Sequence, residues 1–229
     1  MTDQSSAAAF FEAIRSGNDA AVDSAVGANP ALLDARDKTG LSPVIAAATS
    51  GHPKMACRLA DLEALSAAGL DVFDAATTGN VTAVANLLSG GQASVDDPGP
   101  DGYTALHFAA YLGQLEVARL LLGRGADPNA VAMNGSRVTP LHSAVAARHR
   151  DLAGLLLALG GSPNAVQRGG VTPLHSAASN GDEAIVDMLL LRGADPTRAG
   201  DNGKTPIDLA EENGHGALAG VLRKSASNR

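Results

Sequence analysis

The residues with the clearest capacity for chemistry are histidine–serine pairs inside a repeated string. VTPLHSA occurs at 138–144 and again at 171–177, and each copy places a serine directly after a histidine, His142 or His175. Histidine can act as a general base toward a serine hydroxyl, so the pairs are candidates for nucleophilic catalysis. Neighbours in sequence do not face one another on a helix, however, and no Gly-x-Ser-x-Gly motif occurs. We therefore expect no catalytic residues, with a hydrolase as the least favoured alternative.

Metal binding is the second chemistry that the residues suggest. Asp97 and Asp101 occupy the first and fifth positions of a calcium-loop pattern, with Gly102 at the sixth, but Phe108 stands where the bidentate glutamate is required. The six histidines are spread through the chain, and no His-Glu-x-x-His or Cys-x-x-Cys motif occurs. We expect no metal and no cofactor.

Cys57 is the only cysteine, so no internal disulfide can form, which agrees with a reducing cytoplasm. Its position corresponds to residues of surface character elsewhere in the chain, which predicts a partly exposed thiol. No resolving cysteine is present to support a redox function. One alternative nevertheless stays open: a regulatory or stress-related inhibitor or protector of a specific enzyme, with Cys57 as the redox-sensitive site.

Composition limits the classes of partner. The formal charge of −7 and the pI near 5.2 argue against nucleic acid, which requires clustered basic residues. The N-terminus lacks a signal-peptide pattern and no apolar run could span a bilayer, so we expect a cytoplasmic protein without membrane contact. Thirteen arginines against four lysines, together with abundant alanine and glycine, suggest a bacterial source.

The chain repeats at a step of about 33 residues, and this repeat must position every residue named above. Alignment on the two VTPLHSA strings gives seven starts. These starts are Ala8, Ser42, Leu70, Thr104, Thr139, Thr172 and Thr205. A glycine follows nine residues after six of them, and Arg148 takes that position in the other. Each unit predicts a helix, a tight turn, a second helix and an extended loop, and the units must stack to bury their apolar faces.

The histidines of the repeated strings are predicted to stabilise helix starts. Thr139 suits an N-cap, Pro140 suits the first helical position, and His142 at the third position can bond back to the cap as glutamate does in a capping box. We assign this structural function to the residues at the same two positions of four units. They are Thr104, His107, Thr139, His142, Thr172, His175, Thr205 and Asp208. In the units that start at Ala8 and Leu70, Phe11 and Phe73 occupy the histidine position.

The string Thr-Pro-Leu-His, a glycine, a leucine-rich triplet and Gly-Ala-Asp-Pro-Asn-Ala, at this step, resembles the ankyrin repeat. The resemblance covers roughly 8–223, and the chain is similar to bacterial proteins made of ankyrin repeats alone. It implies an all-α solenoid of about seven helix-turn-helix units with short β-hairpin fingers, and a concave face that binds proteins. We expect one domain over 1–229, a missing finger and a seam near 62–69, and a disordered tail at 224–229.

In this family, partner contacts usually come from the finger tips and from the ends of the first helices. Both tyrosines of the chain lie in such positions of one repeat. The candidate partner-binding residues are Tyr103, Phe108, Tyr111, Leu112, Met133, Arg137 and Val138. Packing inside the protein is an equally good interpretation for Tyr103 and Phe108. The resemblance thus implies a non-enzymatic scaffold or adaptor, expected to be monomeric, that binds a protein partner.

Overall fold

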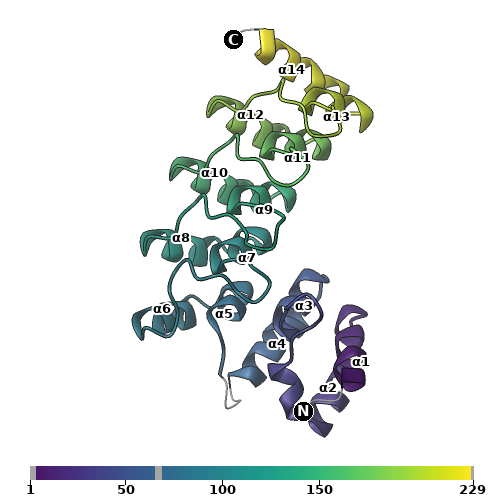
Figure 1. Cartoon of the computed structure of the whole chain (residues 1–229), viewed down its shortest axis with the longest axis vertical. Coiled ribbons are helices and arrows are strands. Elements are labelled where there is room, and N and C mark those ends of the chain that lie inside the picture. The colour runs from purple at the N-terminus through teal and green to yellow at the C-terminus, as the bar shows by residue number, and fades with distance from the viewer. Residues whose placement is uncertain (1–3, 65–68, 228–229) are drawn as a thin grey trace. The chain divides into compact units, whose positions relative to one another are not determined.

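The computed structural model describes residues 4–64 and 69–227 and divides into two compact units, 1–105 and 106–229 (Figure 1). The boundary falls at the first residue of α7 (Ala105–Leu112). All regular structure in the described residues is helical, and the helices follow one another in seven pairs. The predictions of an all-α fold and of about seven helix-turn-helix units are confirmed.

The first unit contains three helix pairs and a short 3-10 helix. The helices are α1 (Gln4–Arg15), α2 (Asp19–Ala28), η1 (Pro30–Asp34), α3 (Pro43–Thr49), α4 (Pro53–Glu63), α5 (Val72–Thr78) and α6 (Val81–Ser89). One apolar cluster joins α1 to α4, with Phe10, Ile14 and Leu59 almost completely buried. Helix α5 packs against both α3 and α4, so the core of this unit is continued by the third pair.

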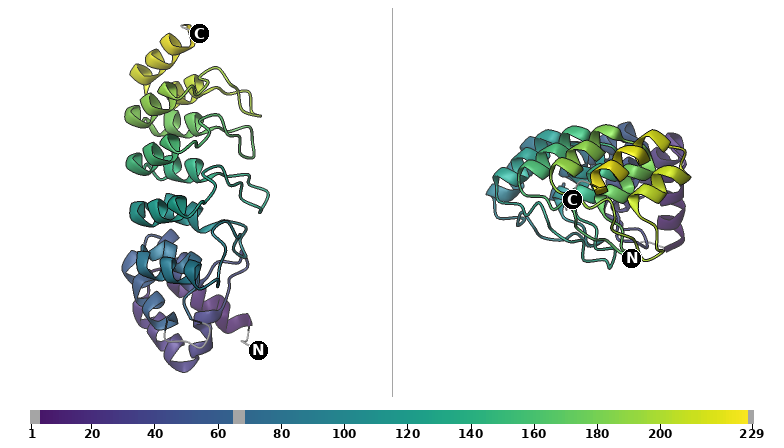
Figure 2. Two further views of the ribbon diagram at one scale, coloured as in Figure 1. Left: turned by 90° about the vertical axis from the view of Figure 1, so that its left-hand side faces the viewer. Right: turned by 90° about the horizontal axis from the view of Figure 1, so that it is seen from above.

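The second unit contains four helix pairs in regular order. They are α7 with α8 (Leu115–Gly123), α9 (Pro140–Ala146) with α10 (Arg150–Ala158), α11 (Pro173–Asn180) with α12 (Glu183–Leu191), and α13 (Pro206–Glu212) with α14 (Gly216–Ser227). First helices pack on first helices, as α9 on α11 and α11 on α13, and second helices pack on second helices. The loops between successive pairs project to the same side of this unit (Figure 2).

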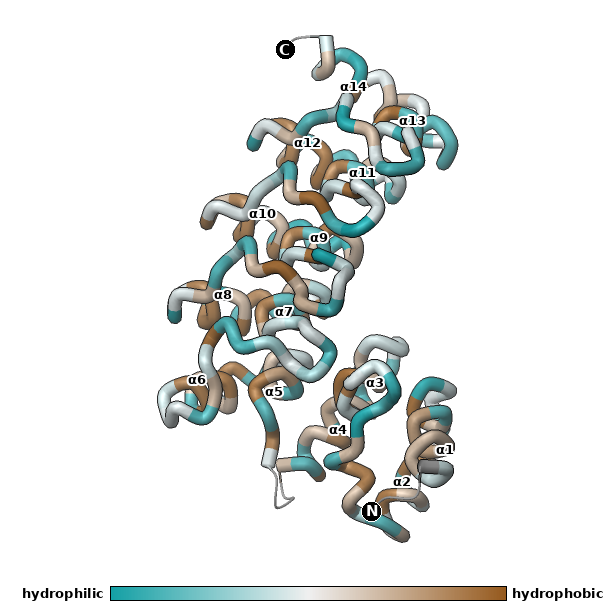
Figure 3. Tube along the Cα trace, viewed as in Figure 1, coloured by the Kyte–Doolittle hydropathy of each residue, from teal (hydrophilic) through white to brown (hydrophobic). Residues whose placement is uncertain are grey.

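Amphipathic spacing explains which helix faces are buried. On α10, the buried residues are Leu152, Ala153, Leu156 and Leu157, whereas Asp151 before them and Ala158 after them are exposed. This spacing of three and four residues puts the apolar side chains on one face. The hydropathy of the helices in the second unit alternates accordingly along the chain (Figure 3). Stacking one pair on the next therefore buries the apolar faces that a single pair would expose.

The predicted fingers are short turns, because each is closed by few backbone hydrogen bonds. In the second unit Ala132 N–H donates to Val138 C=O at 2.8 Å, Gln167 N–H to Val171 C=O at 3.0 Å, and Gly200 N–H to Lys204 C=O at 2.9 Å. One such bond per finger is too little to define a strand, and no strand occurs in residues 4–64 or 69–227. The predicted absence of a finger near 62–69 falls partly on 65–68, outside the described residues.

Three predicted positions need correction. The N-cap of α5 is Asp71 rather than Leu70, because the Asp71 side chain accepts the Asp74 N–H at 2.8 Å, so Asp74 and not Phe73 takes the third helical position. Ala8 lies inside α1, which is already helical at its first described residue. Helix α14 continues to Ser227, so the tail expected to be disordered is helical over 224–227, and 228–229 lie outside the description.

Candidate functional site

The histidines of the repeated strings use both ring nitrogens to hold the scaffold together. His142 Nδ1 accepts the Thr139 backbone N–H at 3.3 Å and lies 2.9 Å from the Thr139 hydroxyl. Nε2 therefore carries the proton and donates to the Val171 carbonyl at 3.2 Å, in the next finger. His175 makes the same contacts with Thr172 and with Lys204. The predicted capping boxes of these two helices are confirmed.

Burial keeps these rings neutral. His107 and His142 are both 2 % exposed, and desolvation lowers the pKa of each ring to about 4. Burial also lowers the pKa of His175. His107 Nε2 bonds to the Val138 carbonyl at 3.0 Å, so the contact to the next finger occurs in three successive repeats. A ring bonded at both nitrogens has no lone pair left to activate a serine, so the histidine–serine pairs are not arranged for nucleophilic catalysis.

The remaining histidines occupy a second structural position, at the turn between paired helices. His149 Nε2 bonds to the Tyr111 carbonyl at 3.0 Å, and His52 Nε2 bonds to the Arg15 carbonyl at 3.1 Å. Each ring lies over a glycine of the preceding repeat: a Cβ atom on Gly113 would stand 2.7 Å from His149 Cε1. These histidines thus satisfy the ends of preceding helices. Within the described part of the chain, no three His, Cys, Asp or Glu residues are grouped to hold a metal ion.

The predicted partner-binding residues divide into exposed and buried ones. Met133 is 76 % exposed and Tyr111 is 43 % exposed, and Arg137 is also exposed. Leu112 and Val138 are half-buried. Phe108 is only 6 % exposed, so its ring belongs to the core and the expectation that it contacts a partner is wrong.

Tyr103 belongs to the first unit and is half-buried, and its carbonyl accepts the Gly99 N–H at 2.8 Å to close a finger there. The remaining predicted residues belong to the second unit. Val131, which the sequence interpretation omitted, is 48 % exposed beside Met133. A pair of valine and methionine in a loop of polar residues could have indicated it. We call Tyr111, Val131, Met133 and Arg137 the exposed patch residues.

The finger that carries Met133 is built differently from the fingers that follow it. Arg137 has a φ of 59°, in the left-handed region where the next finger has Gly170 at 73°. A non-glycine residue in this region costs about 1 kcal/mol or more. The finger is held in place at its tip, where the Ser136 carbonyl accepts the Arg168 N–H at 2.7 Å. The surrounding structure therefore holds Arg137 in an unfavourable conformation while its side chain faces solvent.

A groove, which we call the inner groove, follows α11 between α9 and α13. A hollow of about 270 Å³ there is lined by Ala146, Val171, His175, Ser176, Ser179, Asn180 and Leu209. These residues come from three successive first helices and from the end of one finger. The groove is shallow and mixed in polarity, which suits a segment of another protein better than a buried small molecule.

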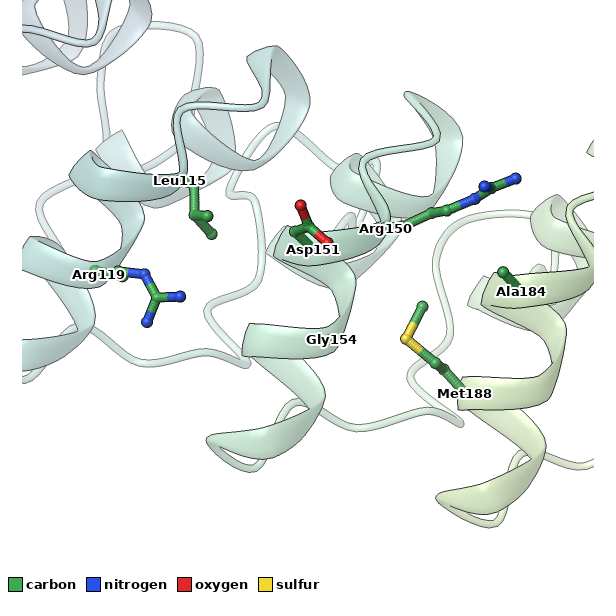
Figure 4. A pocket seen from close by; sticks show the side chains of 7 residues that line it. All are labelled: Leu115, Arg119, Arg150, Asp151, Gly154, Ala184 and Met188. Carbon is green, nitrogen blue, oxygen red and sulfur yellow. The ribbon is translucent and has the colours of Figure 1, made fainter.

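The opposite side of the second unit has a hollow of about 550 Å³ among the second helices α8, α10 and α12 (Figure 4). Gly154 lies at its centre and provides no side chain, while Arg119 and Met188 stand on the flanking helices. Arg150 is held by the buried Asp182 carboxylate at 3.1 Å.

Cys57 is exposed on α4 of the first unit, which agrees with the predicted exposure of its thiol. None of the described helices has the length and apolar character needed to cross a bilayer.

Stacked helix pairs with capped first helices and projecting fingers define a helical repeat protein. Residues 101–132 match the family model "Ankyrin repeat", and residues 141–228 match "Ankyrin repeats (3 copies)", together about half of the chain. The chain belongs to the ankyrin-repeat family, whose repeats are generally protein–protein interaction modules and typically non-enzymatic.

Two curated proteins share a short stretch with the chain. It is 40 % identical over 58 residues to "Serine/threonine-protein kinase TNNI3K" from Mus musculus, and equally to the protein of that name from Rattus norvegicus. The stretch is 25 % of this chain and 7 % of each kinase, so the chain spans a small fraction of these relatives.

Proposed function

We propose that the chain is a non-enzymatic scaffold or adaptor that binds a protein partner through the concave face that the first helices and fingers of its second unit form. The observation that carries the proposal is the exposure of large apolar side chains at the end of one first helix and in the finger that follows that repeat. Met133 lies in the finger before α9, and Tyr111 lies at the end of α7. Exposed aromatic and methionine side chains on a rigid support are typical of interface centres.

Comparison within the second unit supports this assignment. The position of Tyr111 is taken by Ala146 in the next repeat, Ser179 in the one after it and Glu212 in the last. Three small or polar residues show that the stack does not require an aromatic ring there. A rigid groove also loses little conformational entropy on association, which favours binding by a preformed surface.

The proposal is tested by site-specific photocrosslinking in a lysate of the source organism. A photoreactive residue at position 133 or 111 is expected to crosslink one protein, whereas the same residue at position 191 is expected to crosslink none. Leu191 is a matched control because it is 84 % exposed at the end of a second helix. Equal crosslinking from position 191 would contradict the assignment of the binding face.

The captured protein then allows a quantitative test. The double substitution Tyr111→Ser and Met133→Ser should weaken its affinity at least tenfold, because loss of two apolar side chains that the partner would cover costs more than about 1.4 kcal/mol. Leu191→Ser should leave affinity unchanged. Light scattering of the free chain tests the accompanying proposal that it is a monomer.

A further inference from the structure

Two acidic side chains are buried against one another in the first unit. Asp74, in the first turn of α5, is 0 % exposed, and Glu63, at the end of α4, is 3 % exposed. The two carboxyl groups act on one another where α4 packs on α5. Two buried carboxylates that act on one another repel when both are charged, so this contact favours the state in which one of them is protonated.

The surroundings do not neutralise a second negative charge. Ser42, the N-cap of α3, donates its hydroxyl to Asp74 Oδ1. Among the described residues, Glu63 Oε2 and Asp74 Oδ2 are buried without a hydrogen-bond partner. An ionised oxygen in this position loses its hydration and gains no donor in exchange, which is costly.

The charged groups that face the pair are mostly of the same sign. Asp34 from η1 and Asp71 from α5 add negative charge. Arg36 is the basic group that acts on the pair, and its guanidinium is already bound to Asp71 Oδ2 at 3.1 Å. Asp101, beside Asp71 and Arg36, adds a further carboxyl group. If both Glu63 and Asp74 were charged, these two carboxylates would lie near three further acidic groups, with Arg36 as the basic group that opposes them.

We propose that Glu63 and Asp74 form a proton-dependent lock that holds the end of α4 on the first turn of α5. With a proton in the pair the two helices are joined, and with both groups charged the end of α4 is released from α5. The first unit is thereby coupled to pH through a contact that does not involve the inner groove of the second unit.

The direction of the pH effect follows from the proton balance. Burial raises the pKa of Glu63 from 4.5 to about 7, and burial with the neighbouring acids raises that of Asp74. Between pH 4.5 and 7 the folded unit retains a proton that the released chain has lost. Release therefore liberates a proton, and rising pH favours it across this window and no further.

The test is amide hydrogen exchange of the intact chain followed by mass spectrometry, with rates corrected for the intrinsic effect of pH. Protection of 53–63 should fall on the order of a hundredfold between pH 5 and 7.5 and then level off. Protection of 150–158 in the second unit is the internal reference and should not follow that curve. Equal behaviour of both segments would overturn the lock.

Variants assign the effect to the pair. Glu63→Gln should abolish the fall in protection of 53–63, because an amide needs no proton to bond to Asp74. Asp61→Asn is the matched control, since Asp61 lies on the same helix and is exposed, and it should retain the fall. An unchanged pH response in Glu63→Gln would sink the proposal.

A measurement on the unsubstituted chain covers the case in which Glu63→Gln does not fold. The side-chain carboxyl carbon of Glu63 should titrate with a midpoint near 7 by carbon-13 NMR. Ordinary carboxyl midpoints for both Glu63 and Asp74 would show that the pair holds no proton at neutral pH and would overturn the lock by themselves.

Discussion

In the second unit the third position of a first helix holds His142 or His175, and in the first unit the corresponding position of α5 holds Asp74. Each side chain is buried, but the histidines must be uncharged bases and the aspartate belongs to a pair that must hold a proton. Residues 1–105 carry 13 acidic against 5 basic residues, whereas residues 106–229 carry 11 against 12. One repeat architecture thus supports two units with opposite dependences on pH.

The largest expected effect is the loss of the second unit in mild acid. Burial lowers the pKa values of His107 and His142 to about 4, below the value of about 6.5 in an unfolded chain. The unfolded chain therefore binds more protons between pH 6.5 and 4, and folding free energy is lost as pH falls through this window. Once the pH has fallen through this window, each ring has lowered the free energy of unfolding by about 3 kcal/mol.

Amide exchange of 140–146 and 173–180 between pH 7 and 4.5 measures this effect. Protection should fall toward acid there, while protection of 53–63 in the first unit rises. Parallel curves for the two units would show that the contrast between histidine and carboxyl contacts does not determine their stabilities.

The next effect tests the histidines that lie over glycines, a contact that both units contain. Gly113→Ala adds a Cβ 2.7 Å from His149 Cε1 in a residue with a φ of 75°, so it causes both a clash and backbone strain. We expect a loss of about 3 kcal/mol in stability by urea unfolding. Gly125→Ala is the control, because its φ is 92° and no atom lies within 4 Å of the added Cβ.

The control should lose only about 1 kcal/mol, from strain alone. The corresponding pair in the first unit is Gly17, which lies against His52, and Gly51, which faces open space. Alanine at 17 and at 51 should reproduce the same difference. Equal losses at Gly113 and Gly125 would mean that the ring moves away without cost.

Sequence alone was sufficient where the repeat is regular and insufficient where it changes. The Thr-Pro pairs at 139 and 172 fix the phase of the repeat because a cap and a first-turn proline permit only one register. Alignment on glycine spacing misplaced the start of α5, although Asp71 and Asp74 form a local acid pattern of their own. Glu63 follows Met55 and Leu59 at intervals of four, so the sequence indicated that Glu63 lies on the buried face of α4.

Exposure in the candidate site was harder to predict, because it depends on the stack and not on the repeat. Phe108 and Tyr111 stand three residues apart on α7, yet one is in the core and the other is exposed. Met133 lies in a finger that is two residues longer than the next one, counted from the end of the preceding second helix to Thr139 and to Thr172. The length of a loop is visible in sequence, but the direction of its side chains is not.

The smallest expected effect concerns the strained arginine of this finger. Arg137→Gly should stabilise the second unit by about 1 kcal/mol, because glycine adopts a φ of 59° without strain. Arg148→Gly relieves a similar φ of 63° but removes the bond from Arg148 to the Asn180 carbonyl, so its gain should be smaller. If Arg137→Gly raises the urea midpoint and also weakens capture of the partner, the strain is retained for binding. If it raises the midpoint and leaves capture unchanged, Arg137 lies outside the interface, and the exposed patch is reduced to its apolar members Tyr111, Val131 and Met133.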